Sequence, residues 1–323
     1  MLELFRKEQP VSYIFLLLYC LLLRLAVFFG ETNWKPLSTD PLSELIYRTV
    51  GFNNLTTNII GTLLIFIQAV IIIAMVNKNK ITRENSMFAG LFYILVVTLF
   101  PDFNYFSPAL LANTAVILML FNIFSAYKKN GPNSNVFNAG IFAGMAMMLD
   151  FSYGIFFVAG LVGFSVVKAF KFVERIQYII GFVIPIFLTA TYYFLIDQLP
   201  MFQEMFFNNL KWLDWFVPMN YITYIKIIVF GIILLYILLN FNNYGKKNSV
   251  HAQRKVEVLF WFIAFSALTF LFQPGIRLDH LLVMSVPVGI LLGFSILAIE
   301  NKQIAEVLHI ILIATSFLFQ YIL

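Results

Sequence analysis

Long apolar segments alternate with short polar stretches along all 323 residues of the chain. Several segments reach the ~18 residues that a helix needs to cross a hydrocarbon core of about 30 Å. They are continuously apolar, whereas the strands of an outer-membrane barrel alternate apolar and polar positions. The pattern therefore predicts helices, in about eleven membrane segments. These segments are 12–29, 56–76, 87–100, 107–126, 136–149, 152–167, 176–196, 222–241, 258–272, 281–299 and 305–323.

The composition supports a membrane protein. Hydrophobic residues make up 61% of the chain and charged residues only 11%, and the mean hydropathy is +0.88. A soluble core does not hide that much apolar surface, and no polar stretch is long enough to form a soluble domain. We therefore predict an all-α, polytopic transmembrane helical bundle that forms a single integral membrane domain over residues 1–323.

The first apolar segment is interpreted as a retained span and not as a secretory signal peptide. It is long for the apolar part of a signal peptide, it contains Arg24, and it lacks a small-residue cleavage site before Gly30. Cys20, the single cysteine, lies inside the same segment, so the sequence offers no disulfide framework.

The charged residues predict the orientation of the bundle. One set of loops carries 15 of the 21 lysines and arginines, and by the positive-inside rule these loops and the amino terminus are cytoplasmic. The other set carries every aspartate: Asp40, Asp102, Asp150, Asp197, Asp214 and Asp279. We therefore expect a multi-pass protein of a bacterial inner membrane whose acidic loops face outward.

Two outward loops, about 31–54 and 198–221, are amphipathic and rich in aromatic residues. Apolar residues at helical spacing, together with Trp34, Trp212 and Trp215, are typical of helices that lie in the membrane interface. Such helices either form the rim of a lipid-facing groove or anchor the bundle at headgroup level, and the sequence leaves both interpretations open.

The segments 136–149 and 152–167 are short and joined by a tight turn at Asp150. Gly140, Gly144 and Gly154 allow close approach of backbones. The two segments are either a short helical pair packed inside the bundle or two ordinary short, tilted spans.

The motifs of soluble enzymes are absent from the sequence. It contains no GxGxxG after a strand, no GxxxxGK[ST], no HExxH and no CxxC, so nucleotide-phosphate and zinc sites are unsupported. The basic residues are scattered over short loops and do not gather into the stripe that nucleic-acid binding needs. We therefore expect no nucleic-acid partner.

Ionisable residues at the predicted outer level are the remaining candidates for a site. Asp150 stands in MMLDFSYG with almost no loop around it, so its carboxylate must face a cavity, water or a cation. Arg24, in LLLRLAVFF, either extends its head group outward or pairs with Asp102 or Asp150. Lys226 provides a second cation at that depth.

Two outward stretches carry further candidates. QPGIRLDHLLVMSVP, residues 273–287, places Arg277, Asp279 and His280 between two apolar segments. The first outward loop holds Glu31 and Asp40, and a carboxylate on such a loop has the chemistry of a general base. Asp40 precedes Pro41 at an expected helix start, so it is equally a candidate N-cap.

Four features resemble the GT-C class of membrane glycosyltransferases. They are the acidic first outward loop, the stretch FPDFNYFSPALLANTAVILMLFNIFSAYKK, the glycine-rich NAGIFAGMAMMLDFSYGIFFVAGLVGF, and the late corner GIRLDHLLVMSVPVGILLG. The chain departs from the class in lacking an adjacent acidic pair after the first span. A general richness in Phe, Ile, Asn and Lys also resembles integral membrane families of unknown function from flavobacteria.

The GT-C resemblance implies a GT-C-like bundle and a polyprenyl-phosphate sugar donor at the extracytoplasmic face. Arg277, with Arg24, His280 and Asp279, would then bind the lipid phosphate through charge-assisted hydrogen bonds. Asp40 or Glu31 would take the acceptor proton, and Asp102 or Asp150 would order the site or hold a divalent cation.

Two other functions stay open at this point. The missing acidic pair favours a non-catalytic subunit or scaffold that meets other cell-envelope proteins through its outer loops. A transporter or lipid flippase would instead use the intramembrane charges to line a path.

Overall fold

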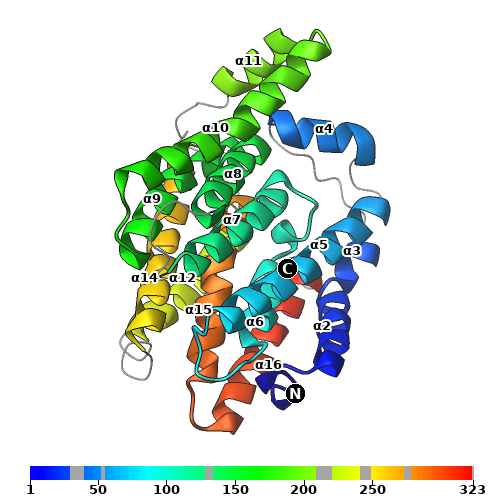
Figure 1. Cartoon of the computed structure of the whole chain (residues 1–323). Coiled ribbons are helices and arrows are strands. Elements are labelled where there is room, and N and C mark those ends of the chain that lie inside the picture. Colours follow the sequence, from blue (N-terminus) through cyan, green and yellow to red (C-terminus); the bar gives the residue numbers. More distant parts are fainter. Residues whose placement is uncertain are drawn as a thin grey trace.

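The structure is a computed structural model, and it describes residues 1–29, 40–51, 55–127, 134–208, 220–240, 249–272 and 278–321 (Figure 1). All regular elements in these ranges are helices. The α-helices are α1 (Glu3–Arg6), α2 (Pro10–Leu23), α3 (Leu25–Phe29), α4 (Pro41–Val50), α5 (Leu55–Lys78), α6 (Phe88–Val97), α7 (Pro108–Ser125), α8 (Ser134–Leu149), α9 (Phe156–Val167), α10 (Phe172–Leu195), α11 (Leu199–Asn208), α12 (Tyr221–Leu239), α14 (Val250–Leu268), α15 (Ser285–Leu297) and α16 (Lys302–Tyr321). Short 3₁₀ helices complete the set: η1 (Pro101–Phe103), η2 (Phe151–Ile155), η3 (Thr269–Phe272) and η4 (Leu278–Met284).

Length and composition make the bundle a multi-pass membrane protein. Within the described residues, six helical stretches are long and apolar enough to span a bilayer, and shorter apolar helices accompany them. The prediction of a polytopic all-α bundle is therefore confirmed. The expected number of eleven membrane segments stays a prediction, since several of the helices are shorter than a full span.

The core is built around α6 and α15, which pack against each other along their lengths. Every residue of α6 is buried, as expected for a helix that is apolar on all sides. Gly289 and Gly293 bring α15 against the backbone of α6, because a Cβ there would lie 2.6 Å from Tyr93 Cα and 2.7 Å from Phe88 O. Helices α10, α12 and α16 leave most of their apolar side chains exposed, as helices that face lipid do.

The first predicted span is divided in two. Helix α2 ends at Leu23, Arg24 leaves the helical conformation, and α3 starts at Leu25. The segment 12–29 is therefore not one continuous helix, and the break falls at Arg24, its one charged residue.

The glycine-rich helices α8 and α9 pack chiefly on different helices. Helix α8 packs on α10 and α7, whereas α9 packs chiefly on α14. A Cβ on Gly140 would lie 2.3 Å from Tyr178 O, and one on Gly144 would lie 2.3 Å from Phe182 O. These two glycines thus allow a close approach to α10, while α8 also contacts η2 and α9. The choice between a short helical pair inside the bundle and two short, tilted spans stays a prediction.

The two ends of the bundle differ. In the view of Figure 1, α4 and α11 lie at the upper end and the amino terminus lies at the lower end. Helices α4 and α11 are the described parts of the two predicted amphipathic loops. Of the three tryptophans named for those loops, Trp34, Trp212 and Trp215, none falls within the described residues.

Candidate functional site at the end that carries α4 and α11

Asp40 stands at the start of α4 and reaches across to η2. It precedes Pro41 in the first turn, and its backbone N–H donates to Ser43 Oγ at 3.0 Å, one bond of a capping box. Its carboxylate is buried, and Oδ2 accepts a hydrogen bond from the backbone N–H of Phe151 at 3.2 Å. The residue is therefore at a helix start, as one interpretation expected, while its side chain contacts a segment 111 positions away.

Asp150 precedes Phe151 and caps η2. Its Oδ1 accepts from Ser152 N at 3.1 Å and from Ser152 Oγ at 2.6 Å. Asp40 and Asp150 thus meet at the same turn, although neither sequence spacing nor hydropathy connects them. The ring of Phe206, on α11, packs edge-on against Phe151 with 5.0 Å between centroids, so α11 covers this turn.

Tyr47 ties α4 to the connection between η1 and α7. Its hydroxyl donates to Phe106 O at 2.7 Å, and its ring lies edge-on to the Phe106 ring. Burial raises the pKa of the Tyr47 phenol well above its ordinary value, and the negative charge of Asp150 raises it further. Tyr47 was not predicted, because nothing in its sequence surroundings distinguishes it from other interfacial tyrosines.

Asp102 lies in η1 and forms an ion pair with Lys226 of α12. The Lys226 Nζ to Asp102 Oδ2 distance is 2.6 Å, with the Lys226 side chain 8% exposed and the Asp102 side chain 34% exposed. The pair joins α12, which has few other neighbours, to the core.

Arg24 is completely buried and binds neutral groups. Its Nε donates to Thr62 Oγ1 at 3.0 Å and its Nη2 donates to Asn104 O at 2.7 Å. In the part of the chain that the structure describes it makes no ion pair. Both sequence interpretations, an outward-reaching head group and a pair with Asp102 or Asp150, are therefore wrong. The guanidinium instead joins α2, α5 and the turn after η1.

The elements on both sides of residues 273–277 lie in this region. Arg277 falls outside the described residues, as does Glu31, and the side chain of Asp279 is likewise not described. The flanking elements are described: η3 contacts η2, and η4 contacts η1 and α7. The ring of His280, in η4, lies edge-on to the Phe270 ring with 6.5 Å between centroids. The turns that carry Asp150 and Asp102 therefore flank the two ends of the corner 273–277.

A polar network that the sequence did not predict lies beneath these turns. Tyr153 of η2 donates from its hydroxyl to Asn113 Oδ1 at 2.8 Å, and Asn113 Nδ2 donates to Leu282 O at 3.0 Å and Ser285 Oγ at 3.2 Å. All four residues are buried. The only sequence signal was an amide within the apolar stretch LLANTAV.

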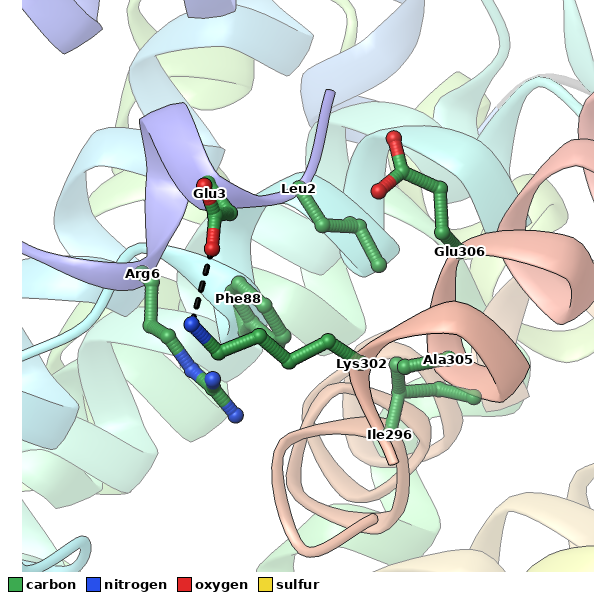
Figure 2. Close-up of a pocket in the computed structure, with 8 residues that line it drawn as sticks. All are labelled: Leu2, Glu3, Arg6, Phe88, Ile296, Lys302, Ala305 and Glu306. Carbon is green, nitrogen blue, oxygen red and sulfur yellow. Dashed lines mark hydrogen bonds and ion pairs between the residues drawn. The ribbon is translucent and has the colours of Figure 1, made fainter. Parts of the chain in front are cut away.

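A separate pocket lies at the opposite end of the bundle, between α1 and α16 (Figure 2). Glu3 and Lys302 form an ion pair at 2.8 Å, and the terminal ammonium of Met1 pairs with Glu306. The hydrogen bond and charge of Lys302 lower the pKa of the exposed Glu3 carboxyl. Both pairs are solvent-exposed and link α1 to α16, so each should contribute little to stability.

No metal cluster is evident in the described ranges, where no three His, Cys, Asp or Glu side chains gather as ligands. Asp102 and Asp150 lie in two separate 3₁₀ turns, and Asp102 is neutralised by Lys226.

The chain matches one family model and two structures of a known membrane protein. A comparison with curated proteins finds no match. The crystal structure of ArnT from Cupriavidus metallidurans bound to undecaprenyl phosphate aligns with a TM-score of 0.57 and 14% identity, over 96% of this chain and 60% of that chain. The apo ArnT structure aligns with a TM-score of 0.52 and 14% identity, over 90% and 56%.

The chain thus spans about 60% of the length of the ArnT chain, and at this identity the likeness concerns the fold. It confirms the resemblance to a GT-C-like helical membrane bundle. A family model described as a family of unknown function (DUF6427) matches residues 42–322, which is most of the sequence. The chain therefore belongs to the DUF6427 family and has a GT-C-like fold.

Proposed function

We propose that this protein binds a polyprenyl-phosphate lipid at the end of the bundle that carries α4 and α11, and transfers a sugar from it. The observation that carries the proposal is the arrangement of the two acidic turns. Asp40 reaches the turn of Asp150, and the elements η2 and η1 contact the segments on either side of Arg277. The ArnT structure with bound undecaprenyl phosphate supports the choice of lipid.

The proposed roles follow from charge and position. Arg277 binds the lipid phosphate, with His280 and Asp279 in the same corner, and Arg24 holds the adjacent turn through Asn104 O. Asp40 or Glu31 accepts the proton of the acceptor hydroxyl. Asp150 and Asp102 order the two flanking turns, and Asp102 does so while paired with Lys226.

We also propose how the protein is placed in the cell. Residues 1–323 form one integral domain of a bacterial inner membrane, with the amino terminus and the basic loops in the cytoplasm. The acidic turns then face the extracytoplasmic side, where α4 and α11 lie in the membrane interface.

Binding of undecaprenyl phosphate to the purified protein tests the proposal. Arg277→Ala should weaken binding at least tenfold, or about 1.4 kcal/mol, because a charge-assisted hydrogen bond to the phosphate is lost. The matched control is Arg254→Ala, which removes an exposed arginine at the opposite end of α14 and should leave affinity unchanged. Equal affinity for all three proteins, or no binding by the wild type, would contradict the proposal.

A second function, a non-catalytic scaffold of an envelope complex, is favoured by one observation. The described carboxylates already have structural partners: Asp40 binds Phe151 N, Asp150 binds Ser152, and Asp102 binds Lys226. Asp40→Asn in cells separates the two functions. A change in lipid-linked glycans with an intact membrane complex supports the transferase, whereas unchanged glycans with a dissociated complex support the scaffold.

A further inference from the structure

Asn113 joins three elements in the apolar interior of the bundle. It lies on α7, is fully buried, and faces both η2 and the start of α15. Its oxygen accepts from the Tyr153 hydroxyl at 2.8 Å, and its amide nitrogen donates to Leu282 O at 3.0 Å and to Ser285 Oγ at 3.2 Å. One side chain thus connects α7, η2 and the junction of η4 with α15.

The network fixes its own geometry. The Ser285 hydroxyl donates to Leu282 O at 2.6 Å, so its lone pairs face the Asn113 amide. The Tyr153 hydroxyl also lies 3.0 Å from Ala109 O, one turn before Asn113 on α7. A buried amide is costly in apolar surroundings unless its donors and acceptor are bound, and here both kinds of group are bound. Moving η2 against η4 would therefore break hydrogen bonds that water does not replace.

The elements that Asn113 joins are those that flank the proposed site. Element η2 follows Asp150 directly and receives the Asp40 carboxylate at Phe151 N. Element η4 begins at Leu278, the residue after Arg277. Because these elements are 3₁₀ turns, their own hydrogen bonds hold them less firmly than α-helices are held, and their relative position depends on side chains.

We propose that Asn113 is a positioning residue: it sets the position of η2, and with it the turn of Asp150, relative to η4, which carries His280 of the proposed phosphate site. This inference rests on the proposed function for its ligand. The coupling of η2 to η4 through the Asn113 amide can be measured separately, without any ligand.

Hydrogen–deuterium exchange of the full-length protein measures the coupling without any ligand. Asn113→Leu keeps the branching of the side chain and removes all three hydrogen bonds, so the amides of η2 and η4 should exchange about fivefold faster or more. Tyr153→Phe removes one hydroxyl and should also accelerate exchange in η2, but to a smaller extent. This variant decides the question if Asn113→Leu does not fold. The matched control is Tyr19→Phe, which deletes another buried hydroxyl, bound to His309 Nε2 at 3.0 Å between α2 and α16.

Binding of undecaprenyl phosphate to the same proteins measures the consequence for the site. Asn113→Leu should bind about tenfold more weakly, or 1.4 kcal/mol, and Tyr19→Phe should bind like the wild type. Unchanged exchange in η2 and η4, or the same change in Tyr19→Phe, overturns the coupling. Faster exchange with unaltered lipid affinity overturns the positioning role. A wild type that does not bind the lipid defeats the proposed function instead, while the exchange result still decides whether Asn113 couples the two turns.

Discussion

The two members of the Lys226–Asp102 pair differ in their access to solvent, and this difference predicts unequal effects of removing them. Asp102→Ala leaves the ammonium of Lys226, whose side chain is 8% exposed, without its partner, which should cost about 2 to 4 kcal/mol of the free energy of unfolding. Lys226→Ala leaves a carboxylate that is 34% exposed and can be hydrated, which should cost about 1 kcal/mol or less. Thermal unfolding in detergent measures both.

Lys302→Ala is the control for this asymmetry, because its ion pair with Glu3 is solvent-exposed on both sides. Its loss should leave the melting temperature unchanged. Equal destabilisation by Asp102→Ala and Lys226→Ala would mean that the lysine reaches water once released, as a long side chain near a membrane surface does.

Burial of the Tyr47 phenol predicts that the protein loses stability at alkaline pH. Its pKa in the folded state is raised by burial, so the phenol stays neutral there while it ionises near pH 10 in the unfolded chain. The stabilisation is complete below pH 10 and is lost as the pH rises further. Tyr47→Phe also lacks the hydrogen bond to Phe106 O, worth about 1 kcal/mol, but has no group to titrate.

The measurement compares unfolding of wild type and Tyr47→Phe between pH 8 and pH 11, since other tyrosines titrate equally in both. The wild type should be the more stable below pH 10, and the gap should narrow above it. A gap that stays constant through this range would show that Tyr47 is already open to solvent in the folded protein.

At the scale of elements, hydropathy predicted where helices occur but not how they pack. The apolar runs gave the helices and their approximate ends, because burying backbone in a membrane requires helical hydrogen bonding. The break at Arg24 and the choice of α10 as the partner of α8 depend on side-chain shape and on single hydrogen bonds. The glycines of α8 indicated a close approach, and the sequence did not say to which helix.

At Gly144, adding a single methyl group should lower the stability of the protein. A Cβ at this position would lie 2.3 Å from Phe182 O, and backbone cannot move aside as a flexible side chain can. Gly144→Ala should therefore force α8 away from α10 and lower stability by roughly 1–3 kcal/mol. Gly231→Ala on α12 is the matched control, since no atom other than the nearby backbone of its own helix lies within 4 Å of its Cβ position.

Thermal unfolding of both glycine variants in the same detergent decides the point. Gly231→Ala should be neutral or slightly stabilising, because alanine is favoured over glycine in a helix by up to about 1 kcal/mol. A similar loss in both variants would indicate that helix propensity, and not the contact of α8 with α10, determines the effect.

At the scale of the whole molecule, the sequence predicted that the three aspartates share one end of the bundle, but it did not predict their contacts. Charge asymmetry put Asp40, Asp102 and Asp150 on one side of the membrane, and the structure brings the turns of these residues to one end of the bundle. Sequence could not show that Asp40 binds the backbone beside Asp150, because that contact joins residues 111 positions apart. It also could not show that Asn113 lies between them and the late corner.

The orientation itself is testable because the chain has a single, fully buried cysteine, Cys20, which should react little with thiol reagents. Thr49→Cys places an exposed thiol on α4, and Asn85→Cys places one in the connection between α5 and α6 beside Lys80 and Arg83. Neither substitution changes a charge, so the positive-inside balance is kept.

In cells whose inner membrane is intact, a membrane-impermeant maleimide should label Thr49→Cys alone, and Asn85→Cys should react only after the membrane is permeabilised. The reverse pattern would place the acidic turns in the cytoplasm, where the proposed extracytoplasmic transfer has no substrate, while equal labelling of both before permeabilisation would contradict a membrane between the two ends of the bundle.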